Sequence, residues 1–335
     1  MARFVRRWRG RWHAAGYILA VSLYIVGAGQ RWISSIESVM QKSSLRRDIP
    51  VILPDPSDAR LVERIDGIDH TGAKVTVSVP VERALTLYLN SQEIVTIMTI
   101  NDYPEYLAIG YLLNQNMLKP DDVVTEVEYD DDLQVVVVRT KQGTNFEQKL
   151  KKRTLTSGCA QGTSFGDLME ALETVVLPRS ELRTSWLYEM THTINTTPSL
   201  YLEAGAIHGC VLCVQGQPVC YMEDVGRHNA VDKLAGWMYR HHVDPADKIL
   251  YTTGRLTSEM TIKTVRMGIP ILISRSGFTA WGVELARKAG LTLIGRARGK
   301  RFVALSRQDR ILFDQNLEYV EEESARNRRK SSDAD

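Results

Sequence analysis

One cysteine in a glycine-containing segment is the residue best suited to carry chemistry in this sequence. Cys159 lies in Thr156-Ser157-Gly158-Cys159-Ala160, and Gly162 follows three residues later. Small neighbours and two glycines predict a loop with tight turns, followed by a helix near Thr163–Val175. A thiol near a helix N-terminus has a lowered pKa and a larger fraction of nucleophilic thiolate. Cys159 is therefore a candidate nucleophile, although its neighbours alone are equally compatible with a buried small side chain.

Two further cysteines form a C-x-x-C pattern, which often marks a metal or redox site. Cys210 and Cys213 lie in His208-Gly-Cys-Val-Leu-Cys-Val, a segment typical of a buried strand. Residues three apart on a strand point to opposite faces, so these two thiols are not expected to share a metal. The sequence also lacks the His-x-Glu and Pro-Cys-x-x-Cys pair of zinc deaminases. We expect a structural role for both cysteines and no catalytic zinc.

A densely polar turn follows. Glu223-Asp224-Val225-Gly226-Arg227-His228-Asn229-Ala230-Val231-Asp232-Lys233 carries seven polar side chains around an expected strand-to-helix turn. His228 and Asn229 lie at or near the predicted helix N-cap. Helix capping and solvated ion pairs are the simpler alternative. The density of polar groups nevertheless makes Asp224 and His228 candidates for a binding site.

Three more polar segments each follow a predicted strand: 253–259, 274–277 and 295–301. The first two segments each contain a glycine, hydroxyl side chains and an arginine, and a helix is expected to begin within the first. Backbone N–H groups at a helix N-terminus, together with such side chains, can bind phosphate. The third supplies four cations beside a glycine. Each segment alone is compatible with a solvated surface. Because ligands of α/β sheets bind beyond the strand C-termini, the three together predict a large, multiply anionic ligand. Neither G-x-G-x-x-G nor a P-loop motif occurs.

The elements that must position these residues divide at about residue 152. Residues 49–152 predict a small β-rich domain with one helix. Its expected elements are strands at Lys74–Val79, Ala84–Leu89 and Glu93–Thr99, a helix at Pro104–Leu113, and a hairpin formed by Val123–Tyr129 and Leu133–Val138.

Residues 153–312 predict an α/β domain, because helices alternate with short apolar strands. The expected strands are Gly205–Val214, Pro218–Glu223, Lys248–Thr252, Ile269–Ser274 and Thr292–Gly295. The expected helices, besides the one after Cys159, are about Glu181–Ile194, Asn229–Tyr239, Ser258–Met267 and Thr279–Ala289. The fold class is therefore α/β, with a smaller β-rich N-terminal domain.

The two ends of the chain differ from the rest. Residues 1–48 carry a net charge of +7, against +2 for the whole chain, so the other residues carry about −5. A basic start and a short apolar run at 14–29 are compatible with a secretory signal, a membrane anchor or a wrongly assigned start upstream of Met40. Residues 313–335 form a charged tail without an apolar period.

Composition narrows the class of protein. Apolar residues make up 44% and charged residues 24%, which is typical of a globular protein, and the small net charge gives no indication of a nucleic-acid partner. Four cysteines in 335 residues do not form a disulfide scaffold. A reactive thiol is better kept in a reducing compartment, so we expect a cytoplasmic protein.

The polar segments together resemble the FdhD/NarQ family of formate dehydrogenase accessory proteins. The resemblance extends over about residues 60–310. It rests on Glu223–Lys233 (EDVGRHNAVDK), Thr253–Met260 (TGRLTSEM), Gly268–Ser276 (GIPILISRS), Val283–Ala286 (VELA), Gly290–Gly295 (GLTLIG) with Arg298–Phe302, and Glu105–Asn114 (EYLAIGYLLN).

This resemblance implies a fold and a function. The implied fold of the C-terminal domain is cytidine-deaminase-like without the zinc. The implied function is to accept persulfide sulfur from a cysteine desulfurase and to pass it to the molybdenum cofactor, as bis-molybdopterin guanine dinucleotide, before insertion into formate dehydrogenase. A homodimer is also implied. Cys159 matches the family's persulfide carrier, and 296–301 match its cofactor-contacting segment. The residues expected at the cofactor are Arg296, Ala297, Arg298, Gly299, Lys300, Arg301, Arg255, Arg275, Asp224 and His228.

The sequence departs from the family at one position. The second cysteine of the family's C-x-x-C loop is replaced by Gly162. A single thiolate is enough to accept a persulfide sulfur, so the carrier function survives this change. The alternative is a cofactor-binding chaperone without sulfur transfer.

Overall fold

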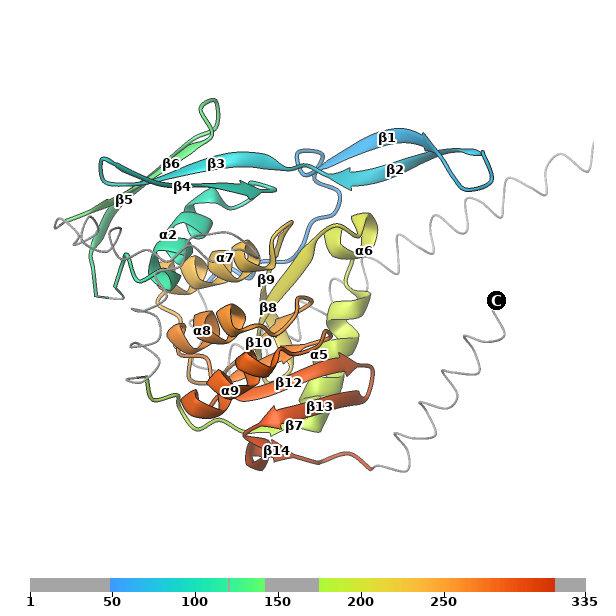
Figure 1. Ribbon diagram of the computed structural model, residues 1–335, viewed down its shortest axis with the longest axis vertical. Coiled ribbons are helices and arrows are strands. Elements are labelled where there is room, and N and C mark those ends of the chain that lie inside the picture. Colours follow the sequence, from blue (N-terminus) through green and yellow to red (C-terminus); the bar gives the residue numbers. More distant parts are fainter. Residues whose placement is uncertain (1–48, 120, 142–174, 317–335) are drawn as a thin grey trace, which may run out of the picture. The chain divides into compact units, whose positions relative to one another are not determined.

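The computed structural model describes residues 49–119, 121–141 and 175–316 (Figure 1). Cys159, Gly162, residues 1–48 and most of the predicted tail lie outside the described residues. Asp48–Asp335 group into one compact unit. Among the described helices, none is both long and apolar enough to cross a lipid bilayer.

The N-terminal half contains a four-stranded sheet and one buried helix. The sheet has the order β4-β3-β6-β5, in which β3 and β6 are parallel and the other neighbours antiparallel. Its strands are β3 (Arg83–Leu89), β4 (Gln92–Thr99), β5 (Val124–Asp130) and β6 (Val135–Thr140). The helix α2 (Pro104–Asn114) packs Leu107 and Leu112 against Leu85, Leu87 and Val136, all of them completely buried. The predicted hairpin is confirmed as β5–β6.

A separate ribbon precedes this sheet. Strands β1 (Val62–Ile68) and β2 (Lys74–Pro80) pair antiparallel with each other and with no further strand of the described chain. β2 was predicted from its alternation of apolar and polar residues. β1 was not predicted, because six of its seven residues are exposed and its sequence therefore shows no buried face.

The C-terminal half contains a six-stranded mixed sheet of order β13-β12-β11-β10-β8-β9. The three central strands β10, β11 and β12 are parallel, and β8, β9 and β13 run antiparallel to their neighbours. The strands are β8 (His208–Val214), β9 (Gln217–Asp224), β10 (Lys248–Thr252), β11 (Ile271–Ser274), β12 (Thr292–Arg298) and β13 (Arg301–Ser306). The mixed α/β class is confirmed, whereas the likeness to cytidine deaminases stays a prediction.

Helices cover both faces of this sheet. α5 (Thr184–Thr196) packs on the face that carries Val211 and Cys213. α7 (Arg227–Arg240) lies on the other face, where the Cys210 thiol contacts the Arg227 carbonyl oxygen. The two cysteines therefore point to opposite faces, as predicted. The remaining elements are α6 (Leu200–Ala204), α8 (Ser258–Arg266), α9 (Ala280–Ala289), the 3-10 turn η2 (Gln308–Arg310) and the short pair β7 (Leu182–Arg183) and β14 (Ile311–Leu312).

Several expected element boundaries differ from the structure by two or more residues, and two of the differences have a clear physical reason. The strand predicted to start at Gly205 starts at His208, because Gly205 ends α6 in the left-handed region at φ 73°. The strand predicted to end at Gly295 continues to Arg298 through a register shift and then turns at Gly299 into β13. The basic segment is therefore a strand end and a hairpin turn and not a loop.

Two glycines join the two halves. A Cβ atom on Gly110 of α2 would lie 1.7 Å from the Asp232 carbonyl oxygen of α7. A Cβ atom on Gly236 of α7 would lie 1.9 Å from the Tyr106 carbonyl oxygen of α2. The backbones of the two helices are thus in direct contact, which only glycine permits at these positions.

This contact predicts a large penalty for a single methyl group. Gly110→Ala is expected to lower the free energy of unfolding by at least about 2 kcal/mol, because the methyl group would force the two helix backbones apart. Gly67→Ala in β1 is the control, since nothing lies within 4 Å of its added Cβ atom. Urea unfolding followed by circular dichroism compares the two variants, and equal midpoint shifts would contradict the proposed contact.

Candidate anion-binding site at the carboxyl edge of the sheet

Three polar segments that are distant in sequence meet at one edge of the six-stranded sheet. β10, β11 and β12 are parallel, so the segments that follow them emerge side by side. The Ser274 hydroxyl donates to the Gly254 carbonyl oxygen at 2.6 Å, and the Arg296 backbone N–H donates to the Ser276 carbonyl oxygen at 2.8 Å. Hydrogen bonds therefore connect each segment to the next, as the predicted site requires.

The end of β12 aims two arginines at this edge. Arg296 has a left-handed backbone at φ 55°, at the register shift with β13. Beside it, a Cβ atom on Gly295 would lie 2.6 Å from the Phe278 ring, so the strand approaches that ring more closely than a side chain allows. Arg296 and Arg298 are exposed, whereas Ala297 between them is completely buried in the core below. The Ala297 side chain therefore contacts the core and not a ligand.

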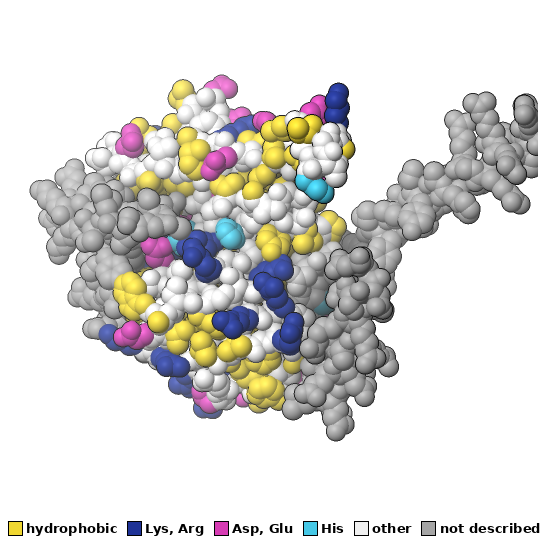
Figure 2. All heavy atoms as spheres, turned by 45° about the vertical axis from the view of Figure 1, so that its right-hand side comes forward, with side chains coloured by type: hydrophobic (Ala, Val, Ile, Leu, Met, Phe, Trp, Pro, Cys, Tyr) yellow, Lys and Arg dark blue, Asp and Glu magenta, His cyan; other side chains and the backbone are white. Residues whose placement is uncertain are grey.

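A groove of about 1070 Å³ lies along this edge. Within the described ranges of the chain, five cationic side chains line it, and no aspartate or glutamate does. The cations are Arg275, Arg296, Arg298, Lys300 and Arg301, all of which were predicted from the sequence. Figure 2 shows Lys and Arg side chains gathered on the face that contains this edge. The groove is suited to a ligand with several negative charges.

Two helices, α5 and α6, hold Arg275 in place. Its guanidinium carbon lies 5.3 Å from the centre of the Tyr201 ring of α6. Its Nη1 donates to Asn195 Oδ1 of α5 at 3.2 Å, and Asn195 Nδ2 donates to the Thr191 carbonyl oxygen at 2.6 Å. Sequence reasoning missed Tyr201 and Asn195, because no pattern links these helices to a segment 80 residues away.

Arg255 is exposed, but it does not line the groove. It belongs to a neighbouring cluster with Arg227 and His208. Burial lowers the pKa of His208, and the charges of Arg227 and Arg255 lower it further. Gly254 leaves room for Arg227, whose Cδ would lie 2.6 Å from a Cβ atom at that glycine. The cationic edge thus extends from β12 to the start of α7.

His228 is buried behind this cluster. Its Nε2 lies 3.2 Å from Glu259 Oε2 at the start of α8. Burial lowers the pKa of His228 to about 2, with further contributions from the charges of Lys263 and Arg227. The imidazole is therefore neutral at physiological pH, and it is 6% exposed, so it contacts the interior more than a ligand in the groove.

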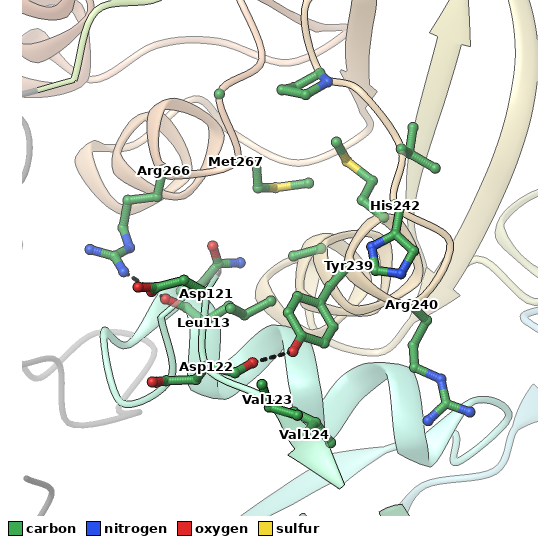
Figure 3. A pocket seen from close by; sticks show the side chains of 16 residues that line it. Leu113, Asp121, Asp122, Val123, Val124, Tyr239, Arg240, His242, Arg266 and Met267 are labelled. Carbon is green, nitrogen blue, oxygen red and sulfur yellow. Dashed lines mark hydrogen bonds between the residues drawn. The ribbon is translucent and has the colours of Figure 1, made fainter. Parts of the chain in front are cut away.

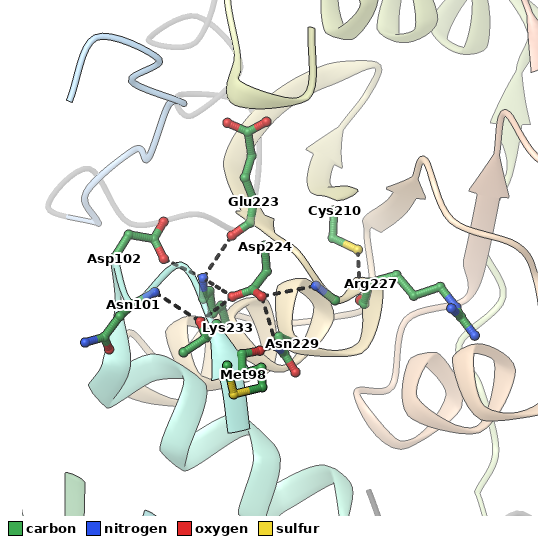
Figure 4. Close-up of polar contacts among 11 residues, drawn as sticks. Met98, Asn101, Asp102, Cys210, Glu223, Asp224, Arg227, Asn229 and Lys233 are labelled. Carbon is green, nitrogen blue, oxygen red and sulfur yellow. Dashed lines mark hydrogen bonds and ion pairs between the residues drawn. The ribbon is translucent and has the colours of Figure 1, made fainter. Parts of the chain in front are cut away.

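Asp224 is completely buried, and Figure 4 shows its polar contacts. Its carboxylate pairs with Lys233 Nζ at 2.6 Å. The same carboxylate accepts hydrogen bonds from the Thr99 hydroxyl at 2.5 Å, from Asn229 Nδ2 at 2.9 Å and from the Gly226 N–H at 3.2 Å. A ligand would have to break this network to reach Asp224, so the geometry gives the residue a structural role.

The described cysteines are poor nucleophiles. Cys210, Cys213 and Cys220 are completely buried. Burial raises the pKa of Cys210 to about 12 and that of Cys213 and Cys220 well above its usual value. None of the three therefore carries an accessible thiolate. Cys159 lies outside the described residues.

A second cavity, of about 760 Å³, lies between the ends of α2, α7 and α8 (Figure 3). Its lining is largely apolar, and two of its polar side chains bind backbone carbonyl oxygens. The Tyr239 hydroxyl donates to the Asp122 carbonyl oxygen at 2.6 Å, and Arg266 donates to the Leu113 carbonyl oxygen at 2.7 Å. The groove, where charges of one sign converge, is the better candidate for a functional site.

The family model, the similar sequences and the similar solved structure all point to the same protein family. The model of the FdhD/NarQ family matches residues 80–312. A sulfur carrier protein FdhD from Wolinella succinogenes is 27% identical over 231 residues, which are 69% of this chain and 81% of that protein. A sulfur carrier protein FdhD from Bacillus subtilis is 27% identical over 242 residues, which are 71% of this chain and 92% of that protein.

A solved structure is also similar. The crystal structure of a protein assigned as a formate dehydrogenase accessory protein from Desulfotalea psychrophila superposes with a TM-score of 0.61 at 27% sequence identity. The match covers 75% of this chain and 99% of that chain.

The buried neutral state of His228 predicts a specific acid sensitivity. The pKa of the His228 imidazole is about 2 in the folded chain, against an ordinary value of 6.5 that applies to the unfolded chain. Below about pH 6.5 the unfolded chain therefore binds a proton at His228 while the folded chain does not, which favours unfolding. Stability from the neutral imidazole is complete above that pH and is lost as the pH falls. Between pH 6.5 and 5 the wild type should lose about 2 kcal/mol more than His228→Gln.

Urea unfolding at a series of pH values measures this difference. His70→Gln, at an exposed turn position, controls for the substitution itself. Parallel pH curves for the wild type and His228→Gln would show that His228 is not held neutral by the fold.

Proposed function

The chain belongs to the FdhD/NarQ family, because that family's model covers residues 80–312, and we propose that it is the sulfur carrier that matures the molybdenum cofactor of a formate dehydrogenase. In this proposal a cysteine desulfurase is the sulfur donor and Cys159 is the carrier. The substrate that receives the sulfur is the bis-molybdopterin guanine dinucleotide form of the cofactor. The protein acts as a homodimer in the cytoplasm.

The observation that supports this function best is the groove, whose lining among the residues described by the structure contains five cations and no carboxylate. Each guanine dinucleotide carries a pyrophosphate, so the cofactor is a large polyanion. Arg296, Arg298 and Arg301 supply planar guanidinium groups that bind phosphate oxygens in pairs. Arg275 adds a fourth guanidinium, which Tyr201 and Asn195 hold in place before the ligand arrives. The residues of the groove therefore fit the proposed substrate.

The cysteines support the choice of carrier. Cys210, Cys213 and Cys220 are buried with raised pKa values, which disfavours all three as nucleophiles. Cys159 is the one remaining cysteine of the sequence and lies among small residues. It acts without a second loop cysteine, since Gly162 occupies that position.

The proposed transfer has two steps. The Cys159 thiolate attacks the terminal sulfur of the desulfurase persulfide, a new S–S bond forms, and the desulfurase cysteine leaves as a thiolate. This exchange is redox-neutral. In the second step the S–S bond of the Cys159 persulfide breaks, the terminal sulfur becomes a sulfido ligand of molybdenum, and Cys159 is released as a thiolate. The two electrons for this reduction come from molybdenum(IV), which becomes molybdenum(VI).

Persulfide formation is directly measurable. After incubation with a cysteine desulfurase and cysteine, intact-mass spectrometry should show a gain of about 32 Da, located on Cys159 by peptide mapping. Cys159→Ala should lose this label, whereas Cys213→Ala, which removes a buried thiol, should keep it. Equal labelling of Cys159→Ala would overturn the carrier role.

Complementation separates sulfur transfer from cofactor binding. In a strain that lacks its formate dehydrogenase accessory factor, Cys159→Ala should restore less than about a tenth of the wild-type formate dehydrogenase activity. Arg298→Glu with Arg301→Glu should fail as well, because the charge reversal repels the polyanion. Arg64→Glu, exposed on β1, is the matched control. Full activity with Cys159→Ala, but not with the double reversal, would favour the chaperone function.

A further inference from the structure

Glu223, at the end of β9, is a buried acidic residue whose backbone and side chain bind different parts of the fold. Its carbonyl oxygen accepts a hydrogen bond from Lys233 Nζ at 2.9 Å. Its side chain points the other way, away from Lys233 and Asp224 (Figure 4). One carboxylate oxygen accepts from the Leu200 N–H at 3.0 Å, and the other accepts from the Tyr201 N–H at 2.8 Å. The carboxylate, on a residue that is 4% exposed, therefore binds the first turn of α6.

The helix α6 depends on such support. It is five residues long, and Leu200 is its one buried residue. A helix this short has little stability of its own, and the N–H groups of its first turn have no partner within the helix. Ser199 Oγ accepts from the Leu202 N–H at 3.3 Å, and Glu223 binds the two N–H groups before it. Ser199 and Glu223 together therefore fix where α6 begins.

Tyr201 connects α6 to the groove. Its backbone N–H is held by Glu223, and its ring lies 5.3 Å from the guanidinium carbon of Arg275. The attraction between a cation and an aromatic ring requires the cation to lie over the ring face at short range, so a displaced ring loses it. Glu223 and Arg275 are thus linked through one residue, although Glu223 is not among the described residues that line the groove.

We propose that Glu223 is a positioning residue for the anion-binding groove: its carboxylate fixes the first turn of α6, and this sets the Tyr201 ring against Arg275. Glu223 acts on a ligand only through Tyr201. This inference rests on the proposed function, because it concerns how the same site is held ready for a polyanion. The alternative is that Glu223 stabilises the fold without any effect on the groove.

The positioning depends on the charge of Glu223. Burial raises the pKa of Glu223 to about 7 and the charge of Asp102 raises it further, whereas the two backbone N–H groups and Lys233 lower it. Tyr221, on the same strand, also senses the carboxylate, whose charge contributes to its raised pKa. A proton converts one carboxylate oxygen into a hydroxyl and removes the negative charge from both hydrogen bonds. The support of Tyr201 should therefore weaken as the pH falls through about 7.

Calorimetric titration of the full chain with inorganic pyrophosphate at pH 8 tests the positioning. Tyr201→Leu should weaken binding about fivefold, because the aromatic ring is lost, whereas Tyr201→Phe should stay within about twofold of the wild type. Glu223→Gln should weaken binding about threefold, because one N–H loses its acceptor and the charge is gone. Glu203→Gln makes the same exchange at an exposed position of α6 and should change nothing.

The double variant shows whether Glu223 acts through Tyr201. Glu223→Gln combined with Tyr201→Leu should bind pyrophosphate as Tyr201→Leu does, because the ring that Glu223 positions is already absent. Losses that multiply, to about fifteenfold, would mean that Glu223 affects binding by another route and would overturn the inference. So would wild-type affinity in Tyr201→Leu or in Glu223→Gln.

A pH series gives a readout that a purely structural role would not change. The ratio of the wild-type affinity to that of Glu223→Gln is compared at each pH, so the titration of pyrophosphate itself cancels. This ratio should fall from about three at pH 8 to about one below pH 6, with a midpoint near 7. A ratio that is constant across this range would overturn the positioning role.

Folding of each variant is checked by urea unfolding under the titration conditions. Should Glu223→Gln fail to fold, the ratio of the wild-type affinity to that of Tyr201→Leu carries the same test, since it should fall over the same pH range. Failure of the proposed function has a different signature: a wild-type chain that binds no pyrophosphate at any pH and acquires no label on Cys159 would overturn both.

Discussion

The structure depends on one buried cation, the Lys233 ammonium group, which joins the two halves of the chain. Lys233 extends from α7 and binds Asp224 at the end of β9, Asp102 before α2 and the Glu223 carbonyl oxygen at 2.9 Å. Burial by itself lowers the pKa of Lys233, but the two carboxylates raise it overall, so the group stays charged. Removing one partner of such a network leaves a buried charge uncompensated, at a cost of about 3–5 kcal/mol.

The same network sets the geometry of the turn that leads into the site. Asp224 holds Gly226 and Asn229, and Asn229 also donates to the Met98 carbonyl oxygen of β4 at 2.7 Å. Arg227 and His228 are therefore positioned by contacts that come from both halves. The glycine crossing of α2 and α7 has the same consequence, because backbones in direct contact leave little freedom for one half to move against the other. Rigid support of this kind preorganises a binding site.

Strands, helices and the C-terminal segment each contribute different residues to the groove. Parallel strands bring charged segments together at one edge, and α5 and α6 hold Arg275 through Asn195 and Tyr201. The C-terminal segment adds the Phe313 ring, which Asp314 holds in place by binding the start of α5. The charged side chains that line the groove in the described part of the chain are all cationic, and a polyanionic ligand would relieve their mutual repulsion. The groove is thus complementary in charge to the polyanionic substrate that we propose.

The sequence by itself determined the α/β class and most elements, and it predicted a set of cations, five of which line one groove in the structure. Periodicity reports burial, and parallel strands place their ends together, so Arg275, Arg296, Arg298, Lys300 and Arg301 were found without coordinates. The sequence also predicted that the Cys210 and Cys213 side chains point to opposite faces of the sheet, because side chains alternate between faces along a strand. Only the tertiary structure decided which polar residues face the groove. Asp224 and His228 have the composition of a site, but their partners, such as Thr99 and Glu259, come from distant segments and enclose them. Phe313 shows the opposite case. It lies in a charged segment without any pattern, and its place at the groove depends on Asp314 binding a helix about 130 residues away, a contact that no local signal encodes.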